Sequence, residues 1–448
     1  MSRLPVIVSF GGINPAGRSS LHHGYRRLVI EKIGAEERNK TMSSLRALMN
    51  KSGEDSRTSQ WILHHSLIRK IEDNLFDTEA IPVNKRTVFS SALGEKTSFL
   101  VKNNQLPTTL PSNWKVEKQD DGLFKVEVDG ELSVLLPDTI SSKVCSAGQL
   151  PTGFDPANLY QSRNHPRGLQ LTVFAASDAV SSLGINWEQV KNRVPPDQIS
   201  VYASSAMGQL DSNGSGGLLQ AALQGRRTTS KNLPLGLAEM TADFVNAYVL
   251  GNVGTTGANI GACATFLYNL RQGINDIKSG KYKVAIVGAS EAPLTPEVIE
   301  GYRKMGALAE DEALAKIDNI ETKNVNHRLA CRPFGENCGF TLSEGSQFII
   351  LFDDELALEL GAEIYGSVAD VFVNADGFKK SIPGPGVGNY LTVGKAMGLI
   401  RSILGAESLR NRSYMQAHGT STPQNRVTES HIFNELAKAF AIKEWPIT

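Results

Sequence analysis

A cysteine at position 263 lies in a context that can make its thiol nucleophilic. Residues 259–266 read Asn-Ile-Gly-Ala-Cys-Ala-Thr-Phe, and the apolar spacing of residues 265–277 predicts an amphipathic helix directly after Cys263. The N–H groups and positive dipole end at a helix N-terminus stabilise a thiolate and can hold a carbonyl oxygen that turns negative under attack. Most free cysteines are small buried hydrophobes, so this context alone leaves both interpretations open.

A histidine far along the chain is a candidate partner for that thiol. Residues 414–423 read Tyr-Met-Gln-Ala-His-Gly-Thr-Ser-Thr-Pro, an apolar strand that leads into His418 and small hydroxyl residues. Between the two motifs, residues 332–345 form a glycine-rich stretch that leads into an apolar strand at 348–352. Cysteine and histidine residues distant in sequence commonly meet as a nucleophile and its hydrogen-bonding partner.

These motifs resemble a known enzyme family in their order and spacing. Gly-Ala-Cys-Ala at 261–264, Arg-Pro-Phe through Glu-Gly at 332–345, and Ala-His-Gly-Thr-Ser-Thr-Pro at 417–423 resemble the β-ketoacyl-ACP synthases of the thiolase superfamily. Residues 6–15 and 204–208 are similar to the family's opening strand and its next glycine-bearing strand end, so the resemblance covers nearly the whole chain. The polar N-terminal insertion and the opening residues look most like the FabY-type synthases, which start fatty-acid chains.

The alternation of strands and helices from residue 168 onward predicts an α/β fold with parallel or mixed sheets. The resemblance implies the thiolase-like form of that fold, two related halves in a layered αβαβα arrangement. We place the halves at 1–290, which carries the nucleophile, and 291–448. Residues of about 77–165 read as a β-rich insertion in the first half.

Several individual elements are predicted from periodicity. Charged helices are expected at 23–50 and 57–75, and Asp129-Gly130 predicts a hairpin between strands at 124–128 and 132–136. Later strands are expected at 199–203, 283–287, 346–352, 367–373 and 413–417.

The resemblance implies a role for each matched residue. In the family, an acyl group moves from a thioester to the cysteine, and malonyl on acyl carrier protein then loses CO2 and attacks the acyl-enzyme. Cys263 would be the acylated nucleophile, with its own N–H as one oxyanion donor, and His418 would stabilise the malonyl enolate. Thr420 and Thr422 would bind the phosphopantetheine arm, whereas Glu429 matches a structural position.

Two positions bear on the length of the acyl chain. Met207 matches a family position at the floor of the acyl pocket, and Tyr302 matches an aromatic residue beside it. Bulk at these positions favours a short primer such as acetyl. Ordinary core packing is an equally good interpretation, because methionine commonly fills irregular gaps.

The chain departs from the family pattern near its end. Arg426 stands where the family has an aspartate. The family's second histidine, in a Lys-x-x-x-Gly-His segment, and a late Gly-Phe-Gly-Gly turn that supplies the other oxyanion donor have no match before Thr448. We therefore expect an incomplete C-terminal half, as in a fragment of a longer protein, and no condensation activity of residues 1–448 alone.

Composition narrows the function classes. The 46 basic and 46 acidic residues balance, so net charge gives no reason to expect nucleic acid or an anionic membrane as partner. Four cysteines without a signal peptide indicate free thiols in a reducing cytoplasm, and their spacing does not favour zinc: Cys145, Cys263, Cys331 and Cys338. We expect no cofactor. The resemblance implies acyl carrier protein and acyl-CoA as partners, and a homodimer.

The leading hypothesis is an acyltransferase that condenses a short acyl-CoA, acetyl-CoA, with malonyl-ACP. A thiolase is a second enzyme hypothesis, although nothing matches its late Cys-x-Gly motif. A synthase-like partner subunit without full activity is the third. Cys263 argues against that subunit, and the missing C-terminal motifs argue for it.

Overall fold

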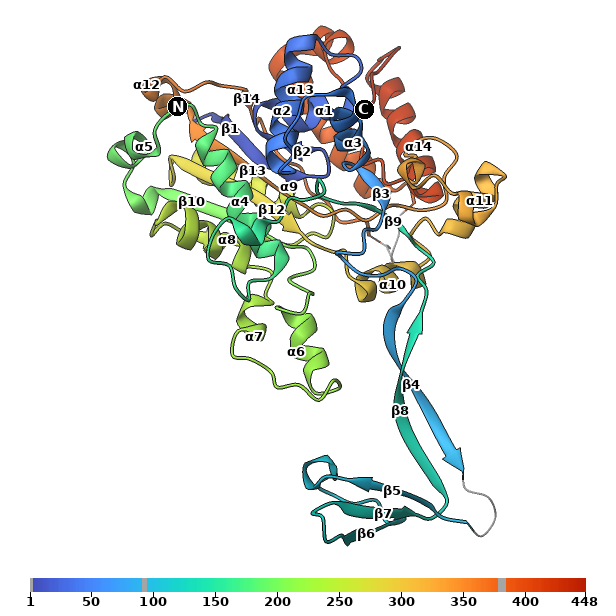
Figure 1. Cartoon of the computed structure of the whole chain (residues 1–448). Helices are drawn as coiled ribbons and strands as arrows, with labels where there is room; N and C mark the ends of the chain where they lie inside the picture. The colour runs from blue at the N-terminus through green and yellow to red at the C-terminus, as the bar shows by residue number, and fades with distance from the viewer. Residues whose placement is uncertain (1–2, 91–94, 378–383) are drawn as a thin grey trace. The chain divides into compact units, whose positions relative to one another are not determined.

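The computed structural model describes residues 3–90, 95–377 and 384–448. The chain divides into two compact units (Figure 1). The first comprises residues 1–75 and 143–448, and the second comprises Phe76–Ser142. Among the described residues, no helix combines the length and the apolar character that crossing a membrane requires.

One mixed sheet organises the first unit. Strands β10 and β12 run parallel, and β13 is antiparallel to both β12 and β1. The strand order across the sheet is β11 (Thr256–Gly257), β10 (Ile199–Ser204), β12 (Val284–Glu291), β13 (Gly345–Asp353), β1 (Pro5–Asn14) and β14 (Gly366–Ser367), with β2 (Gly17–Arg18) beside β1. The strands predicted at 199–203, 283–287 and 346–352 are confirmed as β10, β12 and β13.

Helices cover both faces of this sheet, so its central strands are apolar on both sides. Val284 and Ile286 of β12 pack in one cluster with α4 (Arg167–Ser181) and α8 (Met240–Val245). Ala285 and Val287, which point to the opposite face, pack against α9 (Thr265–Lys278). The continuous apolar run of β12 therefore fixes α9, and with it the residues just before α9, to the sheet.

Helix α4 approaches β1 more closely than a side chain at position 11 would permit. A Cβ atom on Gly11 would lie 2.2 Å from the backbone nitrogen of Ala179. At this contact, the buried Asp178 carboxylate accepts hydrogen bonds from the Gly12 N–H (2.9 Å), the Ser20 hydroxyl (3.0 Å) and the Arg18 guanidinium. This carboxylate ties α4 to the end of the first strand.

The helices predicted at 23–50 and 57–75 are each shorter than expected. The first stretch holds α1 (His23–Leu28) and α2 (Ala35–Leu48), and the second holds α3 (Ser56–His64) followed by strand β3 (Ile68–Lys70). Strand β3 pairs with β9 (Ser146–Gly148), so its backbone groups bond to another strand rather than to a preceding helical turn. Periodicity within residues 57–75 carries no signal of this partner.

The second unit contains two separate sheets. Strands β4 (Ile81–Ser90) and β8 (Glu131–Ile140) form a two-stranded ribbon. Strand β7 (Phe124–Val128) pairs with β5 (Thr97–Val101) and β6 (Trp114–Lys118). The predicted hairpin at Asp129-Gly130 is therefore wrong: the turn exists, with Gly130 at φ +84°, but it links strands of different sheets. The insertion ends at Ser142 rather than near 165, because β9 belongs to the first unit.

The C-terminal part contains helices α10 (Pro296–Lys304), α11 (Asp311–Asp318), α12 (Asp354–Leu360), α13 (Val387–Asn411) and α14 (Pro423–Ala439). Two predicted strands are longer than the pairing observed here. Residues 367–373 contribute only Ser367 to the two-residue β14. Residues 413–417 pair over a short length with residues 446–448: the N–H groups of Met415 and Ala417 donate to the carbonyls of Pro446 and Thr448, around the bridge of Met415 with Ile447. Strand β13 lies beyond residue 290 yet pairs with β1 and β12, so the predicted boundary does not separate two sheets.

Replacing Asp178 with alanine is expected to lower the free energy of unfolding by about 2 to 3 kcal/mol, because three buried or half-buried donors lose a charged acceptor. The midpoint of urea unfolding measures the change. Asp197→Ala, which removes an exposed carboxylate, is the matched control and is expected to stay within about 0.5 kcal/mol. Equal losses in the two variants would contradict the role given to Asp178.

Candidate active site

Cys263 sits on a tight turn immediately before helix α9. The N-cap of the helix is Ala264, and Ala262 adopts a left-handed conformation with φ +49°. The Ala264 N–H donates to the Gly261 carbonyl at 2.9 Å, which closes the turn and leaves Cys263 exposed. The predicted helix from Thr265 to Ile277 is confirmed, and the thiol lies at its positive end, where a thiolate is stabilised.

A buried amide holds this turn against the sheet. The Asn269 side chain, on α9, accepts from the Asn259 N–H at 2.9 Å and donates to the Ser204 hydroxyl at 2.9 Å. The Ser204 hydroxyl in turn donates to the Asn259 carbonyl at 2.7 Å. One side chain therefore joins α9, the end of β10 and the loop that leads to Cys263.

His418 lies in a loop that is fixed by a carboxylate. Glu429 of α14 accepts from the His418 N–H at 2.6 Å, from the Gly419 N–H at 2.9 Å and from the Asn425 side chain at 2.7 Å. Gly419 has φ +59°, a conformation that glycine adopts without strain. Glu429 thus holds the backbone on both sides of the imidazole, in line with the structural role implied for it.

The structure brings Cys263 and His418 together. A side-chain hydrogen bond with Cys263 raises the pKa of His418, burial opposes the rise, and the charges of Cys263 and Glu429 add to it. A raised pKa means that the imidazolium form persists to higher pH beside the sulfur. The arrangement can therefore hold a thiolate and a hydrogen-bond donor side by side, which suits attack on a thioester.

Thr420 and Thr422 lie two and four residues after His418 on the same loop. Their hydroxyl oxygens are 3.1 Å apart, and the Thr422 hydroxyl also caps α14 by accepting from the Asn425 N–H at 3.2 Å. The buried Ser421 hydroxyl accepts from the Arg332 N–H at 2.7 Å, which joins this loop to the glycine-rich segment. The loop is therefore held at both ends.

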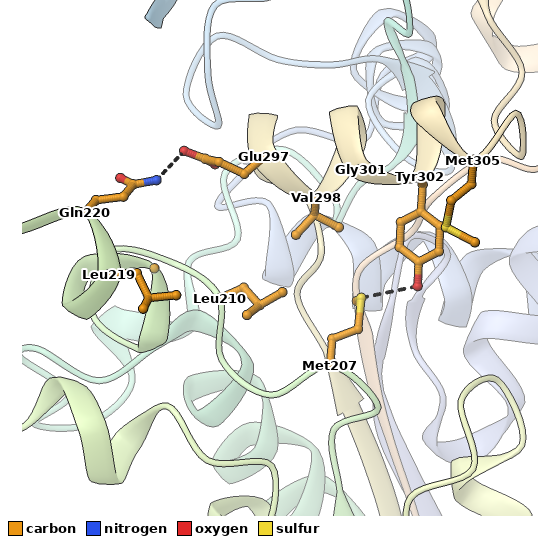
Figure 2. A pocket seen from close by; sticks show the side chains of 10 residues that line it. Met207, Leu210, Leu219, Gln220, Glu297, Val298, Gly301, Tyr302 and Met305 are labelled. Atoms are coloured by element: carbon orange, nitrogen blue, oxygen red, sulfur yellow. Dashed lines mark hydrogen bonds between the residues drawn. The ribbon is translucent and has the colours of Figure 1, made fainter. Parts of the chain in front are cut away.

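Met207 and Tyr302 meet beside a cavity of about 470 Å³ (Figure 2). The Tyr302 hydroxyl points at the Met207 sulfur and lies 3.4 Å from it. Burial raises the pKa of Tyr302, and the charges of Cys263 and Glu291 raise it further, so this hydroxyl lies within range of the charge of the nucleophile. Apolar side chains dominate the lining, which comes from α10, α6 (Ser215–Ala221) and the loop before α6: Met207, Leu210, Leu219, Val298, Tyr302 and Met305.

Sequence reasoning missed two residues that shape this region, Asn269 and Glu291. Each has a signal in the sequence: an amide in the middle of an otherwise amphipathic helix, and an acid that ends an apolar strand. Asn259 precedes Asn269 by ten residues, but the other partners, Ser204 and Ala206, lie far away along the chain, so the signal does not identify a role.

The remaining thiols lie in different surroundings. Burial raises the pKa of both Cys331 and Cys338, which opposes thiolate formation. Cys145 is buried. Within the described part of the chain, no group of three or more His, Cys, Asp or Glu residues is arranged to hold a metal ion.

Comparison with known proteins identifies the family. Residues 100–357 match the family model for the N-terminal domain of β-ketoacyl synthases. The chain is 50% identical to the β-ketoacyl-[acyl-carrier-protein] synthase FabY of Pseudomonas aeruginosa, over 100% of this chain and 73% of that protein. The chain belongs to the β-ketoacyl synthase family. Enzymes of this name are acyltransferases, so the predicted enzyme class is confirmed.

Other relatives agree with this assignment. A 3-oxoacyl-[acyl-carrier-protein] synthase 2 of Staphylococcus aureus is 28% identical over 284 residues, which span 62% of this chain and 65% of that protein. The crystal structure of the ketosynthase FabY from P. aeruginosa superposes with a TM-score of 0.97 over 100% of this chain and 73% of that chain, at 50% identity.

A β-ketoacyl synthase from Burkholderia phymatum STM815 shares the fold, with a TM-score of 0.61 at 18% identity, over 100% of this chain and 80% of that chain. The predicted α/β fold class and the resemblance to FabY-type synthases are therefore confirmed.

In this synthase, removing the thiol is expected to lower the pKa of His418. Cys263→Ala eliminates the hydrogen bond and the charge that raise the pKa, while the opposing effect of burial remains. NMR titration of the His418 imidazole in the wild type and in Cys263→Ala measures the shift in pKa. The variant His431→Gln assigns the His431 resonance, so that it is not mistaken for that of His418. An unchanged His418 pKa in Cys263→Ala would show that the sulfur does not act on this ring.

Proposed function

We propose that this chain is a β-ketoacyl-ACP synthase of fatty-acid synthesis that forms an acyl-enzyme on Cys263. The contact between Cys263 and His418 carries the proposal, because it joins a thiol at a helix N-terminus to a donor that is held by Glu429. The 50% identity to a protein named as such a synthase supports the substrate class.

The reaction has two stages. The Cys263 thiolate attacks the carbonyl carbon of an acyl-CoA, the bond to the CoA sulfur breaks, and CoA leaves as a thiol after gaining a proton. Malonyl-ACP then loses CO2, and the electron pair of the broken bond forms an enolate. That enolate attacks the acyl carbon, and the Cys263 thiolate leaves again.

Each stage builds negative charge on a thioester oxygen, which must be stabilised by fixed donors. The backbone N–H of Cys263 serves as one donor in the acylation stage. His418 donates to the malonyl thioester oxygen in the condensation stage, and its raised pKa favours the protonated ring that such donation requires.

Acyl carrier protein is the proposed partner, since the name of the P. aeruginosa relative includes it. Thr420 and Thr422 are the proposed contacts for the phosphopantetheine arm, because they follow His418 on the same fixed loop. We further propose that the enzyme works as a cytoplasmic homodimer and needs no cofactor.

A short primer, acetyl, is the proposed acyl group. The Tyr302 hydroxyl contacts Met207 and lies within range of the charge of Cys263, whereas Cys263 is absent from the described residues that line the cavity. Met207 and Tyr302 are therefore the side chains proposed to limit the space open to an acyl chain on Cys263. Truncating them would open the cavity to that acyl chain.

Incubation with acetyl-CoA or cerulenin is expected to add one acyl or inhibitor group to Cys263, because the helix N-terminus and His418 favour its thiolate. Intact-mass analysis followed by peptide mapping measures the adduct, and Cys263→Ala is expected to abolish it. Labelling of Cys145, Cys331 or Cys338 instead would contradict the assignment. An unlabelled Cys263 would favour a partner subunit without catalytic activity.

Met207→Ala is expected to shift acylation toward longer acyl donors by about tenfold or more, because each methylene in an apolar pocket is worth about 1 to 3 kcal/mol. Competition between acetyl-CoA and octanoyl-CoA, read as the ratio of the two adducts, measures the shift. Leu223→Ala, an exposed apolar truncation, is the matched control. An unchanged ratio of the two adducts would show that Met207 serves in ordinary core packing and does not limit the acyl chain.

A further inference from the structure

Glu291 is a largely buried carboxylate that ends strand β12 beside the proposed acyl site. It lies opposite Gly345 of β13 in the sheet register, and its charge acts on the Tyr302 hydroxyl. Among the ion pairs that the described residues form, none includes Glu291. A buried acid without a basic partner is costly in its charged form, so such a group is a candidate for a functional role.

The Glu291 carboxylate binds the turn that carries Met207. One oxygen accepts from the Ala206 N–H, and the other lies 3.0 Å from the Ser205 hydroxyl. Burial raises the pKa of Glu291 to about 7, although the bonds from Ala206 and Ser205 oppose the rise. Both protonation states are therefore populated near neutral pH.

The Ser205 hydroxyl has two acceptors within reach but a single proton. Its oxygen lies 3.0 Å from Glu291 and 3.2 Å from the Gly208 carbonyl. When Glu291 is ionised, Ser205 donates to the carboxylate. When Glu291 is protonated, the acid donates to Ser205, and Ser205 donates to Gly208. The proton on Glu291 therefore reverses the direction of this hydrogen bond.

Met207 lies between the two residues whose bonds change, Ala206 and Gly208. On its far side the turn is fixed, since the Gln209 N–H donates to the Gly236 carbonyl at 3.0 Å. The ionised carboxylate holds the Ala206 N–H through a charge-assisted bond, which is about twice as strong as a neutral one. Ionisation consequently fixes Met207 to β12 more firmly.

We propose that Glu291 is a positioning residue whose proton controls how firmly Met207 closes the space beside Cys263. This inference rests on the proposed function, in which Met207 limits the length of the acyl chain. Ionised Glu291 makes the synthase discriminate strongly against long acyl donors. Protonated Glu291 loosens the turn and admits them more readily.

Other titratable groups face the same region and have to be separated from Glu291. Tyr302 lies on α10 and is affected by the charge of Cys263, which in turn bonds to His418. Beyond Gly345, Glu344 is paired with Arg167 at 2.6 Å. The isosteric variant Glu291→Gln keeps all of these groups and fixes the neutral form, so a response that disappears in this variant belongs to Glu291.

The deciding experiment is methyl NMR of the full chain labelled with ¹³C-methyl methionine. The chain has eight methionines, and Met207→Leu assigns the resonance of interest. The Met207 methyl shift is expected to titrate with a midpoint near 7 in the wild type and to lose that transition in Glu291→Gln. Glu312→Gln, which alters an exposed acid on α11, is expected to leave the transition unchanged.

Ser205→Ala provides a second test that does not depend on how Glu291→Gln folds. It removes the hydroxyl that reverses direction, so the Met207 transition is expected to shrink even though Glu291 still titrates. The other methionine resonances report whether each variant is folded. A Met207 resonance that does not titrate in the wild type, or that titrates equally in both variants, would overturn the inference.

The preference between short and long acyl donors provides a further test, because a merely structural role of Glu291 would not make this preference depend on pH. The ratio of acetyl to octanoyl adducts on Cys263 is expected to rise about fivefold from about pH 6 to about pH 8, in line with the gain from a charge-assisted bond. In Glu291→Gln the ratio is expected to stay at its low-pH value. Absence of all adducts would refute the proposed function, whereas adducts with a pH-independent ratio would refute the role of Glu291 alone.

Discussion

The buried amide of Asn269 is the interaction on which the arrangement of this site depends. A nucleophile on a loop is useful when the loop has one position, and loops lack the regular hydrogen bonds that fix strands and helices. Asn269 supplies those bonds by holding the Asn259 backbone and the Ser204 hydroxyl at once. Asn269 lies on α9, whose apolar face packs against β12. The packing that holds α9 on the sheet therefore also holds the turn at Cys263 in place.

The opposite side of the site is built on the same principle with a charged group. Glu429 holds two successive backbone N–H groups at His418, much as Asn269 holds the loop before Cys263. Each catalytic candidate therefore sits on irregular backbone that is anchored by a polar side chain from the following helix. Such anchoring limits motion of the reacting groups, which is what preorganised catalysis requires.

The sequence predicted the parts of this site that are local and left out the parts that are distant. Short patterns of residues predict the helix that follows Cys263 and the strands β10, β12 and β13. The hairpin at Asp129-Gly130 was wrong, and the strands predicted at 367–373 and 413–417 were too long, because a strand is defined by its neighbour, which local alternation does not reveal. Glu291 and Asn269 were missed for the same reason, since each binds the distant segment at the end of β10, at Ser204 to Ala206.

The position of the second unit has an evolutionary consequence. Its two ends leave the first unit close to β3 and β9, which pair with each other from Ile68 with Gly148 to Lys70 with Ser146. A simple reverse turn would be enough to join β3 to β9, yet residues 76–142 take this place in the chain. So long an insertion is tolerated there because the entropy cost of closing a loop grows slowly with its length. The second unit can be lengthened, shortened or exchanged during evolution while the paired strands keep the first unit intact. Related enzymes can therefore differ in this unit without a change in their catalytic residues.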